Sequence, residues 1–369
     1  MRRRARWAGR LGLVAGGTAV GLLLAEGLAR LIQPGGGAEL LMGSVVTPPG
    51  MYAADRDLMY APVPGFEATG RSLAGPVKVR LNRLGLRGGE PAPVAEPRRW
   101  LVLGDSFALS LQVPEEATFE ALLDARLGPE VEVWNGGVEG YSTWQETRRY
   151  AQVDGALGSR AVLLLYFLGN DLYDNAWFPE TIPHWNPDMF MQPPAPSGLS
   201  GWLEGHSFLF AQLRVWQNRR SVADDAHRME RWRDELSLFT RGGAAQLQQR
   251  LPATEAALAE LKARVDSAGD VLLVAVAPPA FQIEPARAAG TLSMVGLDPA
   301  DADLDAPRQA VLASLDRLGI ASCDLVAPLE AAAAAGAQSD FVFDGHWTAE
   351  GHRQVAAALE PCMRAMAPW

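Results

Sequence analysis

The stretch LVLGDSF at residues 101–107 decides the fold, because an apolar run breaks there into Gly-Asp-Ser. A short run of Val and Leu bounded by Gly is typical of a buried parallel strand. A hydroxyl at the carboxyl end of such a strand lies on the edge where open α/β sheets bind ligands. Two interpretations of Ser106 follow: an N-cap of the next helix, or a nucleophile.

Three polar loops elsewhere in the chain favour the nucleophile. These loops are residues 135–141 (NGGVEGY), residues 169–171 (GND) and residues 344–346 (DGH). A serine hydroxyl needs an adjacent base, and His346 is the candidate, with Asp344 to orient its ring. The backbone N–H groups of Ser106 and Gly140 and the side-chain amide of Asn170 are the candidate donors to an oxyanion.

With these four blocks in this order, the chain resembles the SGNH (GDSL-type) hydrolase superfamily over about residues 98–369. The resemblance implies a flavodoxin-like three-layer α/β/α fold with a parallel sheet, and Ser106 as the nucleophile. Asp344 and His346 match the last block with one residue between them, where many members have two. This spacing and the Trp-Thr pair after His346 resemble the polysaccharide O-acetyltransferase branch. In the alginate-type transferases the Asp-x-His precedes the serine motif, whereas here it follows, which favours hydrolysis.

Strand-like and helix-like segments alternate after residue 98, which predicts a parallel sheet with helices on both faces. Strands are expected near residues 100–104, 131–135, 161–168, 271–277 and 321–325, and helices near residues 116–127, 143–158, 253–268 and 305–318 and from Thr348 onward. Residues 172–250 break the alternation and form an insertion after Asn170. Its five tryptophans have two interpretations: a lid that binds substrate, or the insertion's own core.

The N-terminal segment predicts export of the catalytic domain. Five arginines lie within residues 1–10, the expected cytoplasmic tail, and residues 11–32 are the expected signal-anchor transmembrane helix. A cleaved signal peptide is the alternative. Residues 33–97 are expected to be a linker and a small β appendage, with a strand near residues 77–81.

Composition excludes several other function classes. A net charge of −10 argues against a nucleic-acid partner. The histidines of the insertion lack metal-ligand spacing, so neither a metal nor a cofactor is expected, and His352 is interpreted as a packed or capping residue. Cys323 and Cys362 are the only cysteines, and they either pair or remain as buried thiols.

These observations predict a membrane-anchored serine esterase whose catalytic domain lies outside the cytoplasm, in the periplasm or at the cell surface. Its expected partners are the membrane and an ester substrate, either a lipid or an acylated glycan. Two alternatives remain: an O-acyltransferase or O-acetyltransferase acting on cell-envelope polysaccharide, and a non-catalytic binding protein of the same fold.

Overall fold

The computed structural model describes most of the chain. The described residues are 2–32, 47–72, 75–93, 98–185, 198–199, 203, 207, 209–210, 226–341 and 345–369.

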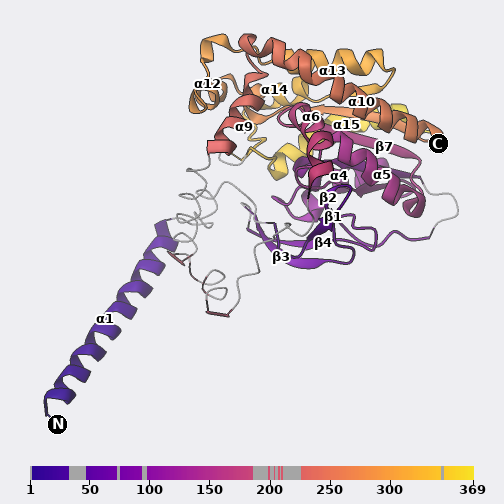
Figure 1. The fold of residues 1–369 in the computed structure, drawn as a ribbon. Coiled ribbons are helices and arrows are strands. Elements are labelled where there is room, and N and C mark those ends of the chain that lie inside the picture. Colours follow the sequence, from indigo (N-terminus) through magenta and orange to yellow (C-terminus); the bar gives the residue numbers. More distant parts are fainter. Residues whose placement is uncertain are drawn as a thin grey trace.

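Five parallel strands form the central sheet in the order β6-β5-β7-β8-β9 (Figure 1). Their bounds are β5 Arg99–Gly104, β6 Glu132–Asn135, β7 Ala161–Phe167, β8 Val271–Ala277 and β9 Ala321–Asp324. Numbered along the chain, this is the flavodoxin-like order 2-1-3-4-5, with its switch point between β5 and β7. The predicted α/β class and all five predicted strands are confirmed.

Helices cover both faces of the sheet because side chains alternate along each strand. Leu101 and Leu103 face one hydrophobic core, whereas Trp100 and Val102 face the other. The first core packs against α5 (Thr143–Leu157), α10 (Ala244–Ala268) and α13 (Ala306–Arg317), and the second against α4 (Phe119–Leu127), α14 (Val326–Ala334) and α15 (Ala349–Met366).

Short helices connect these layers. They are α3 (Ser106–Leu109), η1 (Glu115–Ala117), α6 (Asp171–Thr181), η2 (Ile182–His184), η4 (Arg241–Gly243), α11 (Ala280–Ile283), α12 (Pro285–Met294) and η5 (Pro299–Asp301). A disulfide joins Cys323 of β9 to Cys362 of α15. The sequence left this pairing open.

The β appendage consists of two antiparallel hairpins that pack on the sheet domain (Figure 1). Their strands are β1 (Tyr52–Asp55), β2 (Met59–Pro62), β3 (Glu67–Ser72) and β4 (Gly75–Arg80). The hydrophobic core of the appendage includes Leu109, Leu111, Val138 and Tyr141 of the sheet domain. The appendage therefore shares its core with the loops that follow β5 and β6.

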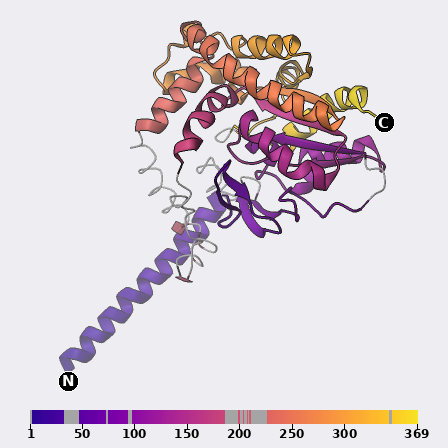
Figure 2. The same ribbon diagram turned by 45° about the vertical axis from the view of Figure 1, so that its right-hand side comes forward.

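A single helix, α1 (Arg2–Ile32), projects away from the body of the molecule (Figures 1 and 2). It spans most of the predicted tail and the whole predicted anchor. Among the described residues, no helix combines the length and apolar character that crossing a membrane requires. The predicted transmembrane signal anchor at residues 11–32 is therefore not supported.

The described parts of the insertion are helical. α6 and η2 begin it, α9 (Ala226–Ser237) follows, and α10 starts within it at Ala244 and continues as a sheet-covering helix. Arg231 of α9 forms an ion pair with Asp174 of α6 at 2.7 Å. Trp232 is 45% exposed, so this indole is not part of a core. Trp202 and Trp216 lie outside the described residues, and the prediction of a lid there stays a prediction.

Candidate active site

Ser106 and His346 lie in contact at the carboxyl edge of the sheet. Their Oγ and Nε2 atoms are 2.8 Å apart, although 240 residues separate them in the chain. Ser106 is the first residue of α3, directly after β5, and the cap of this helix is Asp105, whose carboxylate accepts from the Phe107 N–H at 2.8 Å. Ser106 is therefore not the N-cap, and its hydroxyl is paired with a base.

Aromatic packing fixes the position of the His346 ring. Phe107 stacks on His346 with ring centroids 4.5 Å apart, and on Phe167 of β7 at 3.9 Å. Trp347, which is buried, meets the edge of the Phe107 ring at 5.0 Å. The residue after the serine thus holds the base against the end of the sheet, so the Ser106–His346 pair is preorganised.

The loop after β6 presents a backbone N–H beside the serine helix. The Val138 N–H donates to the Gly104 carbonyl at 2.9 Å, and a Cβ on Gly137 would lie 2.3 Å from the Leu109 nitrogen, so only glycine fits there. Gly140 has a left-handed backbone with φ +70°. Within the described part of the chain, no group accepts a hydrogen bond from its N–H. This is the condition expected of a donor to an oxyanion.

Asn170 caps α6 at the end of β7, on the other side of β5 from the Gly140 loop. Burial raises the pKa of Asp105 to about 6 and that of Asp174 to about 7, and hydrogen bonding from the Asn170 side chain opposes both shifts. Its Oδ1 atom is buried and has no hydrogen-bond partner among the described residues. The Asn170 amide thus lies against the residue that precedes Ser106.

Three acidic side chains are buried close to the serine. Burial raises the pKa of Asp105 to about 6, and it raises those of Glu146 and Asp171 well above their usual range. Repulsion among the three adds to the shifts. Asp171 accepts from the Phe167 N–H at 2.8 Å, which ties its loop to the end of β7. Burial therefore favours the neutral forms of Glu146 and Asp171, whereas Asp105 ionises above about pH 6.

Residues 237–368 match a family model described as the SGNH hydrolase-like domain of acetyltransferase AlgX. This match relates the C-terminal part of the chain, which contains His346, to SGNH hydrolase-like domains. None of the curated proteins compared with the chain matches it.

Several solved structures resemble the chain at low identity and with low TM-scores. They include TesA (16% identity, 73% of this chain and 99% of that chain, TM-score 0.40). A carbohydrate acetylesterase family member from Sinorhizobium meliloti has 15% identity over 74% of this chain and 100% of that chain, with a TM-score of 0.40. A lipase/acylhydrolase from Enterococcus faecalis has 10% identity over 73% of this chain and 96% of that chain, also with a TM-score of 0.40.

The remaining predicted residues divide into two groups. Asp344, the predicted partner of His346, lies outside the described residues, so its role stays a prediction. His352 is buried and accepts from the Phe119 N–H at 3.2 Å, and burial lowers its pKa to about 3. It is a packed neutral residue, as predicted. Among the described residues, no cluster of His, Cys, Asp and Glu is arranged to hold a metal ion.

The contacts between the appendage and the loops around Ser106 were not predicted from the sequence. The buried Arg87 guanidinium donates to the carbonyls of Leu109 (2.7 Å), Ser110 (2.6 Å) and Val113 (2.8 Å), at and beyond the end of the serine helix. Tyr60 of β2 donates to the Glu139 carbonyl at 2.5 Å. No periodicity in the sequence indicates what the Arg87 and Tyr60 side chains contact.

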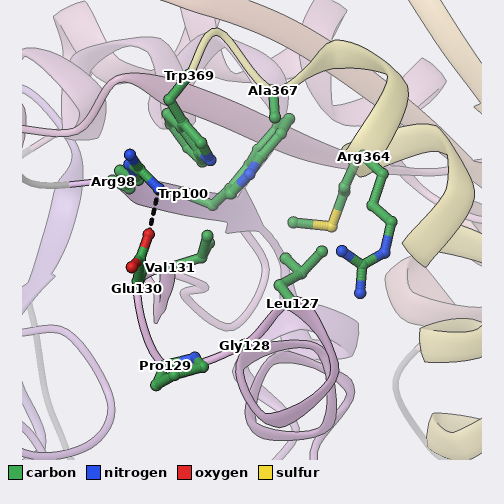
Figure 3. A pocket seen from close by; sticks show the side chains of 11 residues that line it. Arg98, Trp100, Leu127, Gly128, Pro129, Glu130, Val131, Arg364, Ala367 and Trp369 are labelled. Carbon is green, nitrogen blue, oxygen red and sulfur yellow. Dashed lines mark hydrogen bonds and ion pairs between the residues drawn. The ribbon is translucent and has the colours of Figure 1, made fainter.

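A cavity of about 460 Å³ lies at the opposite, amino edge of the sheet (Figure 3). Trp100 and Trp369 pack edge to face in its lining with centroids 6.3 Å apart, and Arg98 pairs with Glu130 at 2.5 Å. The length of β5, roughly 20 Å, separates this cavity from Ser106. The cavity is therefore separate from the Ser106–His346 pair.

Proposed function

We propose that this SGNH protein is a serine esterase that hydrolyses carboxylic O-acyl esters, including O-acetyl esters. The observation that carries the proposal is the 2.8 Å contact between His346 Nε2 and Ser106 Oγ. At this distance the imidazole is within reach of the hydroxyl proton, as general-base catalysis requires.

In the proposed mechanism, Ser106 Oγ attacks the ester carbonyl carbon while His346 takes the hydroxyl proton. The negative oxygen of the tetrahedral intermediate accepts from the Ser106 and Gly140 N–H groups and from the Asn170 amide. Collapse breaks the bond to the alcohol, which leaves with the proton from His346. Water then attacks the acyl-serine by the same route and releases the acid. Asp344 is proposed to hold the neutral tautomer of His346.

The test is hydrolysis of p-nitrophenyl acetate by the full chain and by Ser106→Ala. We expect the wild type to turn over and Ser106→Ala to lose nearly all activity while its thermal unfolding stays unchanged. Ser110→Ala, which removes a hydroxyl at the other end of the same helix, is the matched control. Activity that survives in Ser106→Ala would refute the mechanism.

Acetyl transfer is a second candidate, because the matching family model is that of an acetyltransferase. The two reactions share the acyl-serine and differ only in whether water or a sugar hydroxyl accepts the acyl group. Incubation with an acetyl donor and an oligosaccharide distinguishes them. Acetylated oligosaccharide detected by mass spectrometry, formed only with intact Ser106, would favour the transferase.

We also propose that the enzyme works outside the cytoplasm, in association with the membrane. The Cys323–Cys362 disulfide supports this, because such bonds persist in oxidising compartments. The apolar side chains of α1 are exposed, with Leu13 at 79% and Leu23 at 72%, and lipid contact would cover them. Cell fractionation tests the proposal: recovery of the full chain in the soluble cytoplasmic fraction would refute it.

A further inference from the structure

The oxyanion loop has an anchor in the appendage. Tyr60 Oη donates to the Glu139 carbonyl oxygen at 2.5 Å, although 79 residues separate the two in the chain. Burial raises the pKa of Tyr60 well above its usual range, so the hydroxyl keeps its proton and remains a donor. The Tyr60 hydroxyl is therefore available as a donor to the Glu139 carbonyl at neutral pH.

This hydrogen bond controls the orientation of one particular peptide group. The Glu139 carbonyl and the Gly140 N–H belong to the same planar unit, and in a trans peptide they point in opposite directions. A donor that holds the oxygen on the appendage side therefore directs the N–H away from the appendage. Without that donor, the left-handed turn at Gly140 leaves the peptide able to rotate, because glycine places few limits on φ and ψ.

Tyr60 is itself held firmly. Its backbone pairs with Ala54 in the β1–β2 hairpin, and its carbonyl accepts from Tyr141 Oη at 2.5 Å. Its ring packs between those of Tyr52 and Tyr141, with centroids 5.3 and 5.5 Å away. Tyr52 Oη in turn accepts from the Glu139 N–H at 3.2 Å. The position of the Tyr60 hydroxyl is thus set by the hairpin and by two neighbouring aromatic rings.

We infer that Tyr60 is a positioning residue that aims the Gly140 N–H into the oxyanion hole, and that the appendage is a structural part of the active site. This inference rests on the proposed esterase function. The Tyr60 hydroxyl donates to the Glu139 carbonyl, so we expect it to influence the reaction through the Glu139–Gly140 peptide.

The test compares Tyr60→Phe with Tyr150→Phe in the full chain. Both variants lose one buried hydroxyl and keep the ring, but Tyr150 donates to Asp270 at the opposite edge of the sheet. We expect Tyr60→Phe to lower kcat about tenfold to a hundredfold with little change in KM, up to the worth of one oxyanion donor. Tyr150→Phe should retain wild-type kcat, and both variants should unfold at similar temperatures.

A second readout is inhibition by an alkylboronic acid, whose tetrahedral adduct with Ser106 places an oxygen in the hole. The inhibition constant should rise in Tyr60→Phe by about the same factor as kcat falls. If Tyr60→Phe matches Tyr150→Phe in both kcat and inhibition while hydrolysis still depends on Ser106, the positioning role is refuted and the esterase stands. A wild type without Ser106-dependent hydrolysis would overturn the esterase proposal and this inference with it.

Discussion

Replacing Gly140 by alanine is the sharpest single test of the oxyanion loop. Gly140 has φ +70°, and a Cβ there would lie 2.9 Å from the Tyr60 hydroxyl oxygen. An alanine in the left-handed region costs about 1 kcal/mol, and the close contact forces the hydroxyl off the Glu139 carbonyl. We therefore expect a modest loss of stability together with a fall in kcat of about 10²- to 10³-fold, the worth of one oxyanion donor.

The matched control is Gly269→Ala at the C-cap of α10. Gly269 has φ +77°, and its Cβ would meet nothing within 4 Å. It therefore carries the same backbone penalty at the amino edge of the sheet, away from Ser106. Chemical denaturation and p-nitrophenyl acetate kinetics measure the two effects separately. If Gly140→Ala and Gly269→Ala lose equal stability and both retain wild-type kcat, the Gly140 peptide is not a donor to the oxyanion.

Three more predictions concern single groups. Asn170→Ala should lower kcat about 10²- to 10³-fold in the same assay with KM little changed, and an equal rise in KM instead would indicate a role in binding. Burial raises the pKa of Glu120 from 4.5 to about 8. Glu120 therefore binds a proton more tightly in the folded protein than in the unfolded chain, and the stability that this proton contributes is lost as the pH rises from 4.5 to about 8. The free energy of unfolding of Glu120→Gln, relative to that of the wild type, should therefore rise with pH across that window by at most about 1.4 kcal/mol per pH unit. If the denaturation midpoints of the two proteins differ by the same amount at pH 5 and pH 8, the prediction is wrong. Replacing Cys323 and Cys362 by serine opens a loop of 39 residues and should lower the free energy of unfolding by up to about 4 kcal/mol relative to the oxidised wild type, measured by chemical denaturation. Reducing agent should destabilise only the wild type. An equal loss of stability in the wild type and the variant would contradict the prediction.

The fold was largely predictable because its signals are local. Each sheet strand is a short apolar run that ends in a polar loop, as in residues 161–168, and burial on both faces imposes this composition. Thr348 was predicted to begin the last helix, and its side chain accepts from the Gly351 N–H at 3.1 Å. α10 begins nine residues earlier than predicted, because residues 244–252 include Pro252, which a single-sequence reading treats as a helix boundary.

The candidate site was predictable only as a set of residue types. Ser106, Gly140, Asn170 and His346 stand out because each follows a strand or precedes a helix, and the edge rule for parallel sheets brings such loops together. The function of the appendage was not predictable. Tyr60 belongs to no recognisable motif. Tyrosine is common in β-strands, so its presence in a short hairpin does not indicate a function.

The sequence by itself was enough to predict the order of strands and helices along the chain and the loops in which Ser106 and the glycines lie. These follow from periodicity and backbone conformation, which act over a few residues. Only the tertiary structure decided that Cys323 pairs with Cys362 and that Tyr60 holds the Glu139 carbonyl. Contacts of this kind depend on packing between segments far apart in the chain, and local sequence does not encode them.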